Sequence, residues 1–270
     1  MPAILDTQKA MQGVRALPFC YLCGVIFDCT EVPNADHVPP SGLFAVTDRD
    51  FPLILPTHPT CNANQSKDDQ VVGQLVGVIH GRRPNPTHKK FRVSVGRFEN
   101  GSTALVVGGL DLRRIIRRWI RGFHAALYSE HLPENSRFLT CPPLPEAEPL
   151  ADGPKFRPVM DVVPKFVEEL KRNRATGTLD RIVCRNGKCR YECVWSQADN
   201  GTWMCIYGLD LYEWINLGDT ANFEPRGCVG SYIRSGGGFP PRGTCTTRLE
   251  FSVVNRARLD PFGEKEESNS

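Results

Sequence analysis

CYLC at residues 20–23, DHVPP at 36–40 and HPTCN at 58–62 decide how the amino-terminal part of this chain folds. Both CYLC and HPTCN separate two ligand-type side chains by two residues, a spacing at which one tight turn brings both to the same metal ion. Together they supply four soft or borderline ligands, the set that is typical of tetrahedral zinc. The sequence therefore predicts a structural zinc site formed by Cys20, Cys23, His58 and Cys61, with Cys29 as an alternative to His58.

The composition of the 270-residue chain is that of a globular protein. Hydrophobic residues make up 40% and charged residues 23%, a balance that supports a buried core and excludes general disorder. No run approaches the ~18 apolar residues of a membrane span, and polar residues interrupt positions 1–18. We therefore expect a soluble, cytoplasmic protein. In that reducing compartment, its eleven cysteines favour metal ligands over disulfides.

The DHVPP stretch lies between the two half-sites, Gly42 follows it, and Asn62 comes directly after the second half-site. In this order, the elements resemble the HNH (ββα-metal) nuclease family. The resemblance covers residues 19–70, about a fifth of the chain. It implies an α+β fold with a zinc-stabilised ββα-metal domain at residues 1–80, which would hydrolyse phosphodiester bonds.

The resemblance also implies a role for each residue of the centre. His37 would be the general base, which suits an imidazole because its ordinary pKa lies near neutral pH. Asp36 and Asn62 would hold a catalytic Mg²⁺ or Mn²⁺ through oxygen atoms. Asn64 is an alternative to Asn62. The family's middle Asn, which orients the base, has no counterpart here, and Asp50 is the nearest polar residue.

Positive charge is concentrated next to this centre. The whole chain carries a formal net charge of +3, but residues 81–121 contain eleven basic and two acidic residues, a net +9. A field of this size beside a phosphodiester site favours binding to the nucleic-acid backbone. The residues expected to contact nucleic acid are Lys67, Arg82, Arg83, Arg113, Arg114, Arg117, Arg118 and Arg121.

Residues 81–132 are predicted to form a basic hairpin and an amphipathic helix. The hairpin would join strands at 92–98 and 103–107 through a two-residue turn, Asn100-Gly101. In the helix at 110–128, apolar residues follow one stripe and the five arginines follow the opposite face, which we expect to point outward. A shorter helix is expected at 67–79.

The second half is predicted to be a separate, mainly antiparallel α+β domain at residues 161–262. Seven prolines between residues 133 and 158 indicate a linker at 133–160, and the tail at 263–270 is expected to be disordered. A helix is expected at 162–173, and hairpins at Asn186-Gly187 and Asn200-Gly201. Pairing of the strands in a hairpin would by itself bring cysteines of this half close together. A second zinc site is the alternative explanation for four of them: Cys184, Cys189, Cys193 and Cys205.

The sequence thus predicts a metal-dependent HNH endonuclease, a hydrolase acting on DNA in defence, restriction or mobile-element biology. RNA as substrate and a homodimer stay open, and no membrane partner is expected. One alternative is a zinc-stabilised nucleic-acid-binding module whose nuclease centre is degenerate. Another is an interaction protein whose basic helix binds an acidic protein.

Overall fold

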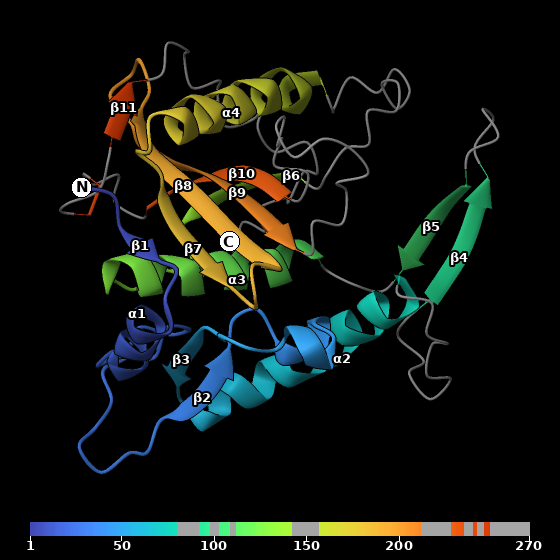
Figure 1. Ribbon diagram of the computed structural model, residues 1–270, viewed down its shortest axis with the longest axis vertical. Helices are drawn as coiled ribbons and strands as arrows, with labels where there is room; N and C mark the ends of the chain where they lie inside the picture. The colour runs from blue at the N-terminus through green and yellow to red at the C-terminus, as the bar shows by residue number, and fades with distance from the viewer. Residues whose placement is uncertain are drawn as a thin grey trace, which may run out of the picture. The chain divides into compact units, whose positions relative to one another are not determined.

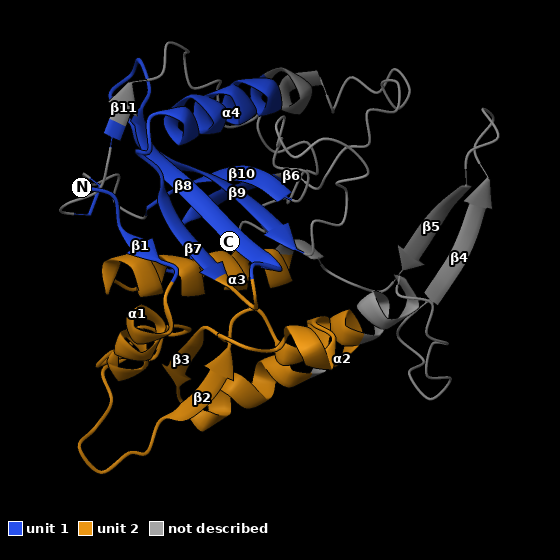
Figure 2. Ribbon diagram, viewed as in Figure 1, with its two compact units in different colours: residues 1–6, 133–183, 187–270 blue, residues 7–132, 184–186 orange. Residues whose placement is uncertain are grey.

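The computed structural model describes residues 1–79, 92–97, 103–108, 112–141, 157–211, 228–234, 240–241 and 246–248. They form a mixed α+β fold that divides into two compact units (Figure 2). Unit 1 contains residues 1–6, 133–183 and 187–270, and unit 2 contains residues 7–132 and 184–186. Among the described helices, none combines the length and the apolar character needed to cross a membrane.

Unit 2 is built from helices and two separate two-stranded sheets (Figure 1). Its main elements are α1 (Gln8–Gly13), β2 (Asn34–His37), β3 (Ile54–Thr57), α2 (Pro59–Ile79), β4 (Arg92–Arg97), β5 (Thr103–Gly108) and α3 (Leu112–Tyr128). β2 pairs antiparallel with β3, with Asp36 opposite Leu55 and His37 opposite Ile54. The chain order β2, β3, α2 therefore places the end of one strand and the start of one helix in the same small motif.

The helix that follows the second cysteine half-site begins earlier than predicted. It was expected to start at Lys67, but α2 starts at Pro59. Proline is favoured at the first helical position because its missing N–H has no intrahelical partner there and its fixed φ suits the helix. As a result, His58 immediately precedes the helix and Cys61 lies in its first turn.

The amphipathic helix α3 matches the predicted 110–128 helix within two residues. Its apolar stripe is buried, as predicted, through Ile115, Trp119 and Phe123. At Gly122 the helix approaches its neighbours so closely that an added Cβ would lie 2.8 Å from a side-chain carbon of Val38. Even one methyl group at this position would require α3 or the Val38 side chain to shift.

Two predicted hairpins are present, but each has a different register from the predicted one. In β4–β5, Arg97 lies opposite Thr103, one residue away from the pairing that a two-residue turn at 100–101 would produce. In the hairpin of β8 (Cys189–Gln197) and β9 (Trp203–Leu211), the Ala198 N–H donates to the Thr202 carbonyl and Gly201 has a φ of +79°. This is a three-residue loop with glycine in the left-handed region, a common alternative to the two-residue turn.

Unit 1 is a mostly antiparallel, seven-stranded sheet covered on one face by a helix. Its strand order is β1-β7-β8-β9-β10-β6, and β11 pairs with β8. The strands are β1 (Ile4–Leu5), β6 (Arg137–Cys141), β7 (Asp180–Cys184), β8 (Cys189–Gln197), β9 (Trp203–Leu211), β10 (Cys228–Ile233) and β11 (Thr246–Arg248). Helix α4 (Arg157–Ala175) buries Phe166 and Leu170 in a cluster with Val194 and Ile206 of the sheet.

Residues 133–160 were predicted to form a linker, but this prediction is wrong for part of the segment. Residues 137–141 form β6, which pairs with β10, and α4 begins at Arg157. Residues 134–141 contain no proline, so a strand can form between the flanking prolines. Pro158 lies in the first turn of α4, where a missing N–H breaks no helical hydrogen bond. Residues 142–156 and the tail at 263–270 lie outside the described residues.

Candidate functional site

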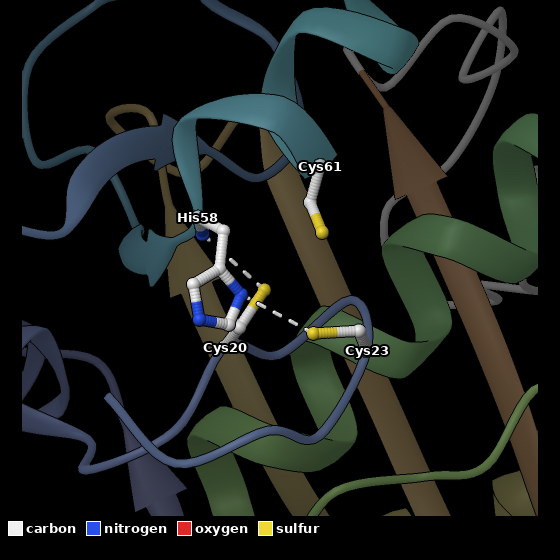
Figure 3. A group of neighbouring side chains, drawn as sticks. All are labelled: Cys20, Cys23, His58 and Cys61. Carbon is white, nitrogen blue, oxygen red and sulfur yellow. Dashed lines mark hydrogen bonds between the residues drawn. The ribbon is translucent and has the colours of Figure 1, made fainter. Parts of the chain in front are cut away.

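The predicted zinc ligands come together in unit 2. The ligand atoms of Cys20, Cys23, His58 and Cys61 all lie within 4.8 Å of one another (Figure 3). Cys23 Sγ is 3.3 Å from His58 Nδ1, and the backbone N–H of His58 donates to Cys20 Sγ at 3.4 Å. Three sulfurs and one imidazole nitrogen are the donor set of a structural zinc site, so this cluster could hold a zinc ion.

Electrostatics within the cluster favour a bound cation. Burial and the neighbouring Cys20 and Cys23 thiols raise the pKa of Cys61 to about 12. A thiolate there would be repelled by its neighbours, whereas a divalent cation converts the same neighbours into shared ligands and deprotonates them. The grouping of three thiols is therefore unfavourable for three separate thiolates and suitable for one metal ion.

His58 has a second partner, Glu31, that sequence spacing did not reveal. With Nδ1 facing Cys23, the outer nitrogen Nε2 lies 3.4 Å from Glu31 Oε2. A carboxylate behind a metal-binding imidazole fixes the tautomer and the ring orientation. Cys29, the alternative ligand, is exposed and its thiol donates to Asp28 Oδ1 at 3.1 Å. The structure therefore selects His58 over Cys29 for the cluster.

The cysteines of the second half do not form a comparable cluster. Cys184 ends β7 and Cys189 begins β8, so both flank the turn that contains Asn186 and Gly187, as predicted. Within the described ranges, the group around Cys61 is the one His, Cys, Asp or Glu set compact enough for a metal ion. The alternative of a second zinc among these cysteines therefore receives no support.

His37 ends β2 and is partly buried. Burial lowers the pKa of His37, and the positive charges of Arg185 and Arg15 lower it further. A lowered pKa keeps the imidazole neutral at and below neutral pH, which is the form that accepts a proton.

Asp36 lies beside His37 but faces a buried hydrogen-bond network. The hydroxyl of Tyr21 donates to Asp36 Oδ2 at 2.6 Å. Burial raises the pKa of Asp36, while the Tyr21 hydrogen bond and the charge of Arg118 act in the opposite direction. Asn62 lies in the first turn of α2, partly exposed, and Asn64 is exposed. The described hydrogen bonds join Asp36 to Tyr21, and none joins it to Asn62.

Two of the five arginines of α3 are buried, so the prediction that all five point outward is wrong for them. Arg118 is 4% exposed and forms an ion pair with Asp69 of α2. Arg121 is 9% exposed and donates to the carbonyls of Leu22 and Leu132. Their face of the helix meets a carboxylate and main-chain carbonyls of the same unit, so these two guanidinium groups serve the fold of unit 2.

The remaining residues that were predicted to contact nucleic acid differ in their exposure and in whether the structure describes them. Arg114 is exposed, and its guanidinium donates to both carboxylate oxygens of Asp68 at 2.6 and 2.7 Å. Arg117 is partly buried. Lys67 lies in α2 and Arg113 in α3, but their side chains are outside the described part of the chain, as are Arg82 and Arg83 entirely. Asp68 and Asp69 thus neutralise part of the basic face.

The two ion pairs between α2 and α3 should differ widely in their contribution to stability. Arg118→Ala removes the buried member of its pair and leaves the partly buried Asp69 without a partner, and we expect it to lower the free energy of unfolding by about 3 kcal/mol. Arg114→Ala is the matched control, and its exposed pair with Asp68 should contribute less than about 1 kcal/mol. Urea unfolding of both variants measures the difference, and equal costs would contradict a structural role for Arg118.

The chain matches no family model, no curated protein and no solved structure.

Proposed function

We propose that this chain is a zinc-stabilised, metal-dependent endonuclease of the HNH (ββα-metal) type that hydrolyses DNA. The observation that carries the proposal is the chain order β2, β3, α2, together with the residues at the end of the first strand and at the start of the helix. His37 ends the first strand, and the four zinc-type ligands gather at the start of the helix within 4.8 Å of one another.

In the proposed reaction, His37 accepts a proton from the attacking water. Asp36 and Asn62 would offer oxygen ligands, the kind that Mg²⁺ and Mn²⁺ prefer. A bound divalent ion would neutralise charge on the phosphate and on the leaving oxygen. Tyr21 holds one carboxylate oxygen of Asp36. This hydrogen bond and one from the His37 backbone N–H fix the direction of the carboxylate.

The buried setting of Asp36 also favours a second candidate function. A carboxylate that is buried and bound by a phenol is harder for an ion to reach than an exposed one. The alternative is therefore a zinc-stabilised module that binds nucleic acid through its basic face without cutting it. The two candidates share the zinc site and differ in turnover.

Cleavage assays on the zinc-loaded chain separate these functions. We expect nicking of supercoiled plasmid with Mg²⁺ or Mn²⁺ and none with a chelator present, and parallel assays on single-stranded DNA and RNA define the substrate class. Salt-dependent DNA binding without any cleavage would instead support the binding module. No affinity for nucleic acid would refute both and favour a protein partner for the basic face.

Charge reversal at Arg114 and Arg117 should weaken DNA binding. Each phosphate contact that is lost lowers the slope of log K against log salt by about 0.9, because one fewer counterion is released. We expect the double variant to reduce both affinity and slope, as measured by fluorescence anisotropy over a salt series. Arg181→Glu is the control, because Arg181 is also exposed and ion-paired, but with Asp6 of unit 1. An unaltered slope in the double variant would show that Arg114 and Arg117 face solvent and do not contact the phosphates.

A further inference from the structure

Residues 184–186, at the turn after β7, belong to unit 2 (Figure 2), and Arg185 among them is buried. It is 1% exposed. Its guanidinium donates to the Arg49 carbonyl at 2.8 Å, to Ser41 Oγ at 3.0 Å and to the Pro39 carbonyl at 3.3 Å. The same group lies over the Phe44 ring, 5.2 Å from the ring centre. All of these partners belong to one loop.

That loop, residues 38–53, connects β2 to β3 and begins immediately after His37. A long connection between two short strands has few ladder hydrogen bonds to fix it. The fork of a guanidinium supplies several donors in a rigid plane, so one arginine can hold both ends of such a loop. Here the bound acceptors range from position 39 to position 49, which covers most of the connection.

The backbone of Arg185 makes a further contact with the same loop, at a strained position. Its N–H donates to the Phe51 carbonyl at 3.1 Å. Phe51 has a φ of 50° and Arg185 a φ of 56°, both in the left-handed region that bulky side chains rarely adopt. Such conformations persist where the surroundings hold them, and they are common at functional sites. The neighbouring Asn186 adds a hydrogen bond to the Thr47 carbonyl at 3.2 Å.

We propose that Arg185 is a positioning residue for the nuclease centre: it holds the 38–53 loop so that the His37 imidazole keeps one orientation. The proposal rests on the proposed function. It assigns to the β7–β8 turn the orienting task that the family's middle Asn performs, a residue with no counterpart between Pro39 and Leu53. It also gives part of the second half of the sequence a role in the reaction, through the three residues that belong to unit 2.

The test compares Arg185→Lys and Arg185→Ala in the full chain with wild type. Lysine keeps the positive charge but lacks the planar fork, so it preserves the fold better than alanine. We expect kcat for plasmid nicking to fall about 100-fold in Arg185→Ala and by a smaller factor in Arg185→Lys, because small displacements of reacting groups are costly. KM and zinc content should stay within twofold of wild type. Hydrogen exchange of peptides spanning 38–53 should become at least about tenfold faster, since local opening becomes easier.

Arg181→Ala is the matched control. Arg181 lies in β7, next to the same turn, but it is exposed and pairs with Asp6. Unchanged kcat in Arg185→Lys and Arg185→Ala would overturn the positioning role, and so would a loss confined to KM. Unchanged exchange in the 38–53 loop would overturn it without reference to activity. A wild-type chain that does not cleave would refute the proposed function instead, and the exchange result alone would then decide whether Arg185 holds the loop.

Discussion

His37→Ala should reduce plasmid nicking by about 10²–10⁴-fold, the usual contribution of a general base. The reason is that the imidazole at the end of β2 has a pKa lowered by burial, Arg185 and Arg15, so it is neutral and able to accept a proton. The residue is only partly buried and is not a member of the zinc cluster. The variant should therefore keep its zinc content and its unfolding midpoint in urea. Single-turnover cleavage with Mg²⁺ or Mn²⁺ measures the effect.

His131→Ala is the matched control for this prediction. Burial and the charge of Arg121 lower the pKa of His131 as well, so the pKa values of both histidines are shifted in the same direction. His131, however, has no role in the proposed reaction, and its variant should retain cleavage. Wild-type rates in His37→Ala would refute the base assignment. An equal loss in both variants would point to a general structural effect.

The zinc cluster could be predicted from sequence because its information is local. Each half-site is a short segment in which the spacing itself brings two ligands together, and the segment around Pro59 also starts a helix. The two antiparallel hairpins of the second half were likewise predictable from asparagine–glycine turns, although the loop length at Asn200-Gly201 was not. A turn with one more residue uses the same glycine in the left-handed region, so the residue types do not separate the two registers.

The roles of the arginines depend on tertiary contacts and could not be read from periodicity. The pattern of α3 places five arginines opposite its apolar stripe, but it cannot show that Asp68 and Asp69 of α2 face two of them. Arg185 is a sharper example, because its partners lie 136 to 146 positions earlier in the chain. Glu31 was also missed, since its contact with His58 follows from the fold of a loop and not from a spacing rule.

Cys61→Ser should abolish stoichiometric zinc binding and unfold the region around residues 20–61. Structural zinc contributes roughly 10–16 kcal/mol to folding in small zinc-finger peptides, as much as the whole free energy of unfolding of a typical domain. Cys23 is exposed and Cys61 is only partly buried. Apolar packing around these two side chains is therefore too small to hold them in place without the metal. Chelation of the wild-type chain should have the same effect. Zinc analysis together with hydrogen exchange of peptides from 20–61 measures both.

Cys29→Ser provides the control, because Cys29 is an exposed thiol of the same segment that donates to Asp28 and lies outside the cluster. It should bind one zinc per chain with wild-type exchange rates. If Cys61→Ser also kept its zinc and its protection, the four side chains would not be the ligands of a structural site. If it lost zinc but stayed folded, the cluster would bind metal without stabilising the fold, and the β2-β3-α2 motif would have to derive its stability from the packing of α3 at Gly122.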